Sequence, residues 1–173
     1  KTRCLALILG LMLLGSGLFA PARAEIAWEA ADPFFEDTVF VGDSIMAQLG
    51  RYQAEAKKEG IPLLGEARFL AAVSYTLFLG SRQKAQPDKI TLKIKGNPVS
   101  LHEGLKKLGA KRAFVMLGIN DNAGAQLEKQ IGFYAKMVEQ IRQTNPGIDL
   151  ICLSVTPVTK AAHKIVKAIG EDI

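Results

Sequence analysis

The sequence predicts a single α/β domain in which a mainly parallel sheet is covered by helices on both faces. The main observation is an alternation of short apolar runs, typical of buried strands, with longer stretches whose apolar residues recur at helical spacing. Glycine and proline separate these segments. The chain has 173 residues, of which 49% are hydrophobic and 23% charged, and this is the size and composition of one folded domain rather than of a disordered chain.

The first 24 residues have the pattern of a secretory signal peptide. A basic start precedes an apolar run that ends at Phe19, and the small residues Ala22 and Ala24 mark a cleavage site after Ala24. The apolar run is short for a membrane span, so an uncleaved anchor is the less favoured alternative. We therefore expect residues 25–173 to form an extracytoplasmic domain, secreted or in the cell envelope, with no stable membrane insertion after cleavage.

The charge and the cysteines limit the partners to be expected. Most of the net charge of +5 comes from Lys1, Arg3 and Arg23, so the domain after cleavage gives no reason to expect a nucleic-acid partner. Cys152 is the one cysteine left after cleavage, and its apolar neighbours predict a buried core residue. Two isolated histidines and one cysteine are too few for a metal site, and no glycine-rich nucleotide motif follows a strand, so neither a metal nor another cofactor is expected.

The first predicted strand and helix meet at a serine. A strand over 38–41 ends at Gly42, and a helical pattern begins directly after Ser44 and runs to residue 59. The apolar residues of this helix are Ile45, Leu49, Tyr52 and Ala56. Ser44 thus lies between the end of a strand and the N-terminus of a helix, where a nucleophile is exposed and backbone N–H groups can stabilise a negative charge. Asp43 and Ser44 are also common helix caps, and a purely capping role is the plainer alternative.

The next part of the chain predicts a strand, a β-hairpin and a short helix. The strand covers residues 67–73, and residues 74–79 are ambiguous between strand and helix. Alternation over 90–94 and a turn over 95–98 predict a hairpin with one solvated face. Ser100 and Glu103 form the pattern of a capping box for a helix over 101–108, in whose first turn His102 is expected to be a surface residue.

The last part of the chain brings a second polar motif to the end of a strand. A buried strand over 112–117 is followed by Gly118-Ile119-Asn120-Asp121 and then by a long helix. The apolar stripe of this helix consists of Leu127, Ile131, Tyr134, Val138 and Ile141. A strand over 148–153 and an amphipathic piece over 162–169 follow. Right-handed crossovers place the ends of parallel strands along one rim, so Ser44, the Ala72 region and Asn120 are expected to meet there.

Two motifs at this rim resemble those of the SGNH (GDSL-like) hydrolases. Gly42-Asp43-Ser44 matches the family's first block, and Gly118-Ile119-Asn120-Asp121 matches its third block, each directly after a strand. The resemblance covers about residues 37–157. It implies a flavodoxin-like three-layer α/β/α sandwich.

The resemblance also implies hydrolysis of carboxylic esters by a serine nucleophile. Ser44 would be the nucleophile, and the side-chain amide of Asn120 would join the oxyanion hole. Ala72 aligns with the glycine of the family's second block and would offer its backbone N–H as a further oxyanion donor. The supporting residues, which would hold the turns by capping and loop hydrogen bonds, are Gly42, Asp43, Gly118 and Asp121.

The family's Asp-x-x-His block, which supplies the catalytic base and its orienting carboxylate, has no counterpart in the sequence. His163 is the one late histidine, and Lys160 stands three positions before it in place of an aspartate. The family's last strand and closing helix also have no counterpart, so we expect an incomplete hydrolase domain over residues 25–173. Without its base, such a chain would be inactive or barely active.

The expected substrates are esters of small molecules, of glycans (such as O-acetyl groups) or of lipids. A non-catalytic secreted binding module of the same fold is the alternative, and an Asp-x-x-His beyond Ile173 in the reading frame would decide against it. A phosphate-accepting receiver domain is a third class. It is disfavoured because it requires an acidic cluster and a lysine at the strand ends and has no use for a signal peptide.

Overall fold

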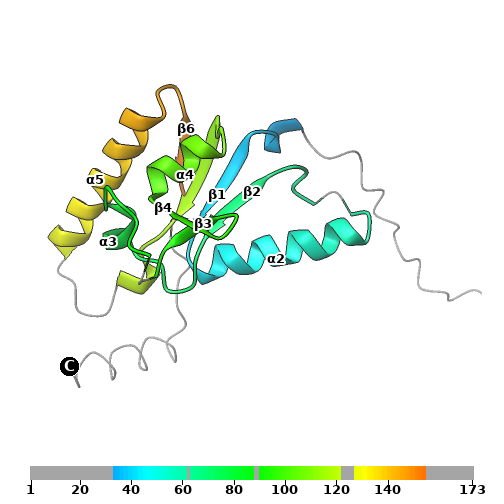
Figure 1. Ribbon diagram of the computed structural model, residues 1–173, viewed down its shortest axis with the longest axis horizontal. Coiled ribbons are helices and arrows are strands. Elements are labelled where there is room, and N and C mark those ends of the chain that lie inside the picture. The colour runs from blue at the N-terminus through cyan, green and yellow to red at the C-terminus, as the bar shows by residue number, and fades with distance from the viewer. Residues whose placement is uncertain (1–32, 62, 88–89, 122–126, 155–173) are drawn as a thin grey trace, which may run out of the picture.

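The computed structural model describes residues 33–61, 63–87, 90–121 and 127–154 (Figure 1). The expected signal peptide over residues 1–24, the amphipathic piece over 162–169 and His163 lie outside these residues. In chain order the elements are η1 (Pro33–Phe35), β1 (Thr38–Gly42), α2 (Ser44–Lys58), β2 (Arg68–Ala71), α3 (Leu77–Gly80), β3 (Leu92–Ile94), β4 (Asn97–Val99), α4 (Leu101–Lys107), β5 (Arg112–Met116), η2 (Ile119–Asp121), α5 (Leu127–Thr144) and β6 (Asp149–Cys152). Of the helices described, none has the length and apolar character needed to cross a membrane.

The main sheet has the order β2-β1-β5-β6, and every neighbouring pair is parallel. Counted along the chain, these are the second, first, third and fourth strands of the sheet, which is the strand order of the flavodoxin-like doubly wound fold. β1 therefore lies between β2 and β5 (Figure 1). The predicted fold class, a parallel sheet flanked by helices, is confirmed.

The predicted hairpin is also present, as β3 and β4 in antiparallel pairing. Its turn consists of Lys95 and Gly96, both with positive φ, at 49° and 82°. Positive φ at both central residues is the requirement of a type I′ turn, whose twist matches that of the two strands. Lys93 is exposed on the strand before the turn while Leu92 is fully buried, so the hairpin has the one solvated face that its alternation predicted.

Alternate residues of β1 point to opposite faces of the sheet, as the pleat requires. Val39 and Val41 point into the larger core, which α3, α4, α5 and the hairpin cover. Phe40 points the other way, into a smaller core to which Met46 of α2 contributes. Figure 1 shows α2 apart from α4 and α5, with the strands between them. The helices thus form the two outer layers of a three-layer sandwich.

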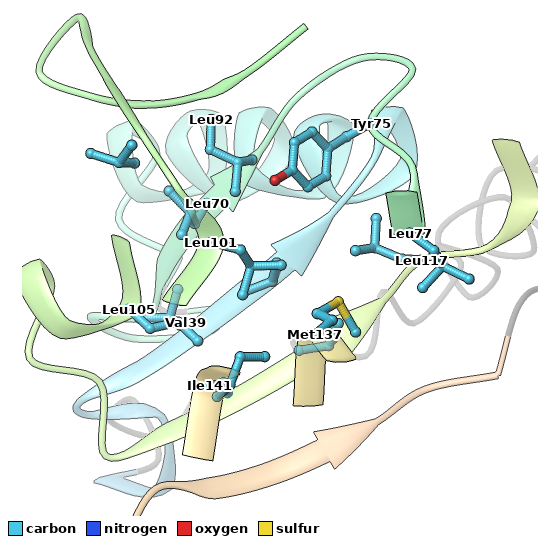
Figure 2. Packing of buried hydrophobic residues seen from close by; sticks show 14 residues of the cluster. Val39, Leu70, Tyr75, Leu77, Leu92, Leu101, Leu105, Leu117, Met137 and Ile141 are labelled. Atoms are coloured by element: carbon cyan, nitrogen blue, oxygen red, sulfur yellow. The ribbon is translucent and has the colours of Figure 1, made fainter. Parts of the chain in front are cut away.

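The larger core is built mainly of aliphatic side chains from both the sheet and the helices above it, with Tyr75 among them (Figure 2). Its most deeply buried large side chains, each at most 1% exposed, are Val39, Val41, Leu70, Leu92, Leu101, Leu105, Val115, Met137 and Ile141. Burying one such side chain contributes roughly 1.5–3 kcal/mol, against the entropy of ordering the chain. Figure 2 shows Leu77 beside Leu117, so the core reaches the edge of the sheet from which the loops emerge.

Three phenylalanines form a row across the other face of the sheet. Phe40 of β1 is in register with Phe69 of β2 and with Phe114 of β5. Its ring stacks on both neighbours, with centroids 5.3 Å from Phe69 and 5.0 Å from Phe114. Such cross-strand aromatic pairs stabilise the pairing of strands beyond their buried area. They help to fix the register of the three strands that carry the two motifs.

At two positions of α2, the buried residue is the one directly after the residue that the spacing predicted. Ile45 and Tyr52, expected on the apolar stripe, are 38% and 60% exposed, whereas Met46 and Gln53 are buried. Gln53 is tolerated there because its side-chain amide donates a hydrogen bond to the Gly65 carbonyl at 2.8 Å. Gln53, with its hydrogen-bond partner in another segment, is thus buried in place of the predicted Tyr52.

The predicted environments of His102 and Cys152 are wrong. His102, expected at the surface, is buried, and its Nε2 lies 3.4 Å from the hydroxyl of Ser100. That hydroxyl donates a hydrogen bond to the Glu103 carboxylate at 2.9 Å and caps no backbone N–H of α4, so the reciprocal capping box is not formed. Cys152, expected in the core, is exposed because β6 lies at one edge of the described sheet.

Candidate active site

Three strands of the sheet end at the same level. Gly42, the last residue of β1, is in register with Ala71, the last residue of β2, and with Met116, the last residue of β5. The segments that follow these strands therefore share the carboxyl edge of the sheet, at the point where the strand order reverses around β1. Both matched motifs, which contain Ser44 and Gly118, are brought to this one edge.

Ser44 is the first residue of α2, and the residue before it caps the helix. Asp43 is 1% exposed, and its carboxylate accepts a hydrogen bond from the N–H of Ile45 at 2.9 Å. The sequence left open whether Asp43 or Ser44 caps the helix, and in the structure Asp43 does so. The half-buried Ser44 makes no side-chain hydrogen bond with any other described residue. Its hydroxyl is available at a helix N-terminus, where backbone N–H groups favour a negative charge.

The two motif glycines are required by the backbone. A Cβ at Gly42 would lie 2.4 Å from Cγ of Met46 and 2.8 Å from the carbonyl oxygen of Met116, and there is no space for it. Gly118 has a φ of 125°, which residues with a Cβ rarely adopt. The chain can therefore turn sharply after β1 and after β5 only with glycine at these positions.

Asn120 and Asp121, in η2 after β5, both bind the loop after β2. The Nδ2 of Asn120 donates a hydrogen bond to the carbonyl of Tyr75 at 3.1 Å. The carboxylate of Asp121 accepts hydrogen bonds from the N–H groups of Leu77, at 2.9 Å, and of Phe78, at 3.5 Å. Asp121 thus caps α3, a loop-holding contact of the kind the sequence predicted for it. A side-chain amide carries two N–H donors, so Asn120 keeps a second donor for a ligand.

The loop after β2 differs from the prediction. The backbone N–H of Ala72 donates to the carbonyl of Gly42 at 3.2 Å, because the pairing of β2 with β1 continues one residue beyond the strand end. This hydrogen bond argues against Ala72 as the oxyanion donor expected from the sequence. The chain turns at Ser74, whose φ of 59° lies in the left-handed region. Sequence reasoning missed this turn, for which Ser74, a polar residue within an apolar stretch, was the one signal.

No general base lies beside Ser44 among the described residues. His102, the histidine among these residues, lies near the opposite edge of the sheet. Its carbonyl accepts a hydrogen bond at 3.1 Å from Nδ2 of Asn145, which lies between the end of α5 and the start of β6. Asn145 follows the last turn of α5, whose 18 residues span about 27 Å. The first turn of α5 lies at the motif edge, where the Nε2 of Gln130 donates to the Asp121 carbonyl at 2.8 Å.

Burial shifts the pKa values of two groups of the larger core and its surroundings, His102 and Tyr75. Burial lowers the pKa of His102, although the nearby carboxylate of Glu103 acts in the opposite sense. Burial also raises the pKa of Tyr75 far above its ordinary value, so that its hydroxyl stays protonated. Within the ranges that the structure covers, no three side chains of His, Cys, Asp or Glu lie together as metal ligands would.

Solved structures that match this chain include one bacterial and one fungal protein. One, from Streptococcus pneumonia and described as a platelet activating factor, is 15% identical with a TM-score of 0.47, and the match covers 79% of this chain and 51% of that one. The other, a carbohydrate esterase family 3 protein from Talaromyces cellulolyticus, is 17% identical with a TM-score of 0.46, and the match covers 79% of this chain and 70% of that one. The chain thus spans about half the length of the first. No protein-family model and no curated protein matches the sequence.

Proposed function

We propose that this protein is an exported serine hydrolase of the SGNH type, acting on carboxylic esters. One observation carries the proposal: Asp43 caps α2, which leaves the hydroxyl of Ser44 without a structural role at the edge where Asn120 is anchored. A serine that only capped the helix would accept a backbone N–H, and Ser44 does not. The signal-peptide pattern of the first 24 residues supports an extracytoplasmic location.

The reaction would proceed by acyl transfer. The Oγ of Ser44 forms a bond to the ester carbonyl carbon while a base takes the hydroxyl proton, and the carbonyl oxygen becomes an oxyanion. The N–H of Ser44 and the second Nδ2–H of Asn120 would stabilise that oxyanion, each by about 3 kcal/mol. Collapse then breaks the bond to the alcohol, which leaves with the proton. A water molecule releases the acid from Ser44 by the same steps.

The proposal requires a base from outside the described residues. His102 is excluded by its place at the opposite edge of the sheet. In the resembled family this base is the histidine of an Asp-x-x-His block, and in this sequence the remaining histidine is His163. A non-catalytic binding module is the second candidate function, and the lack of a base beside Ser44 among the described residues is the observation in its favour.

Labelling of the full-length protein, including any residues that its reading frame encodes beyond Ile173, with a fluorophosphonate, which reacts only with activated serines, separates the two candidates. We expect labelling together with hydrolysis of p-nitrophenyl acetate, and we expect Ser44→Ala to abolish both without loss of helical circular dichroism. Ser100→Ala is the matched control, because Ser100 also precedes a helix and lies beside a histidine. An unlabelled and inactive wild-type chain would instead favour the binding module.

A further inference from the structure

An apolar groove of about 500 Å³ lies next to the matched motifs, between the first half of α5 and the ends of β5 and β6. Its apolar walls are formed by Leu77, Leu117, Leu127, Ile131, Tyr134 and Leu153. Gln130, Cys152 and Ser154 are its polar side chains, and no described lining residue is charged. The volume is within the range of sites that bind small organic molecules.

One end of the groove lies next to the segments that carry the proposed oxyanion hole. Leu77 lines the groove, and its N–H donates to the carboxylate of Asp121, the residue after Asn120. Gly118, the first residue of the second motif, also lines the groove. A ligand whose carbonyl group lay at the oxyanion hole could therefore extend its acyl substituent into the groove.

The far wall of the groove exposes apolar side chains to solvent. Leu127 and Ile131, predicted on the buried stripe of α5, are 66% and 59% exposed. The stripe becomes buried only further along α5, where Met137 and Ile141 enter the core. The prediction was wrong for the first turns because the sheet ends there and the groove takes its place. Uncharged, apolar walls of this kind match an uncharged hydrocarbon chain.

We propose that this groove binds the acyl chain of the ester, so that the substrates carry a medium-length apolar acyl group rather than acetate. This inference rests on the proposed function for the position of the carbonyl group. Each methylene that leaves water in such a groove strengthens binding by up to about fourfold. Esters with acyl chains of medium length are therefore bound and hydrolysed in preference to acetates.

Cys152 offers a test of binding that does not depend on turnover. It is exposed and lines the groove, and the sequence has one other cysteine, Cys4, which Cys4→Ser removes. In that full-length background we expect decanoate to slow alkylation of Cys152 by N-ethylmaleimide at least about fivefold, saturably, and acetate to have no effect. Ile131→Asp places a charge on the exposed wall and abolishes the protection. Ile90→Asp, at an exposed isoleucine outside the groove lining, leaves the protection intact.

The same variants are then assayed with p-nitrophenyl esters of increasing chain length. We expect kcat/KM to rise from acetate to decanoate in the parent, Ile131→Asp to remove this rise through KM, and Ile90→Asp to retain it. Protection of Cys152 by decanoate in a chain that hydrolyses no ester would keep the groove as an acyl-binding site and overturn the proposed function. Hydrolysis of acetate, without protection of Cys152 by decanoate and without a preference for longer acyl chains, would overturn the proposal that the groove binds the acyl chain. A Cys152 that resists alkylation without ligand would do the same, because another part of this chain or a second copy would then fill the groove.

Discussion

The side-chain amide of Asn120 is joined to the carbonyl of Tyr75 by a hydrogen bond of 3.1 Å. The first residue lies after β5 and the second after β2, and β1 lies between these two strands. The link therefore bridges the end of β1, where Ser44 begins α2. One amide thus fixes the two loops that flank the proposed nucleophile, and it is also the proposed donor to the oxyanion.

Replacement of this amide tests both roles. We expect Asn120→Ala to lower kcat for ester hydrolysis by about 10²-fold or more, because a preorganised donor to the oxyanion is lost. The lost bond to the Tyr75 carbonyl lowers the free energy of unfolding by about 1 kcal/mol. Steady-state kinetics and urea denaturation measure the two effects separately. An unchanged kcat would remove Asn120 from the oxyanion hole and leave it only the loop contact.

Gly42→Ala is expected to lower the free energy of unfolding by about 3 kcal/mol, at the upper end of the range for overpacking. The new Cβ would meet Met46 and the backbone oxygen of Met116, and a backbone atom cannot move aside as a side chain can. Gly132→Ala is the control, because no atom lies within 4 Å of a Cβ on that face of α5. It should stabilise the protein by up to about 1 kcal/mol through helix propensity. Equal effects of the two substitutions in thermal unfolding would contradict the close contact at Gly42.

Asp121→Ala should lower the free energy of unfolding by about 1 kcal/mol, because α3 loses the carboxylate that accepts the N–H of Leu77. Asp121→Asn retains an acceptor oxygen and should lose much less, since asparagine caps helices about as well as aspartate. Urea denaturation of the two variants measures the difference. If kcat instead fell by orders of magnitude in Asp121→Asn with stability retained, Asp121 would take part in the chemistry and not only in capping.

The buried His102 predicts a dependence of stability on pH. Its pKa in the folded protein is lowered by burial, whereas in the unfolded chain it returns to about 6.5. At pH values between these two, the unfolded chain binds a proton that the folded protein does not, so stability falls as the pH falls below about 6.5. We expect the free energy of unfolding to decline less steeply from about pH 7 to 5 in His102→Gln than in the wild type. Parallel curves from denaturation at a series of pH values would show that His102 is not responsible.

The places of the strands along the chain could be predicted because short apolar runs, separated by glycine and proline, determine them locally. That β1 and β5 end at or near Gly42 and Gly118 could also be predicted from the sequence. The chain turns sharply at each of these positions, and only glycine allows such a turn. What could not be predicted depends on tertiary partners. Gln53 is buried through the Gly65 carbonyl, and no spacing rule contains that contact.

The environments of single residues were harder to predict than the elements that carry them. Cys152 has apolar neighbours in sequence, but its exposure is decided by the place of β6 at the edge of the described sheet. The N–H of Ala72 is taken up by the Gly42 carbonyl, because the pairing of two strands extends past their assigned ends. In each case the deciding group is far away in the sequence. The motif residues were recognised, whereas the loop around Ser74 that completes the edge was not.

The central place of β1 also has a consequence for the order in which the protein folds. β1 is made early in synthesis, yet its pairing with β5 joins residues far apart in the chain, with Thr38 beside Arg112. Pairing of such distant segments carries a large loop-closure cost and slows folding. Until β5 is available to pair, the edge around Ser44 cannot assemble, and β1 has no partner on that side. A chaperone that holds the unfolded chain through this interval would therefore raise the yield of folded protein.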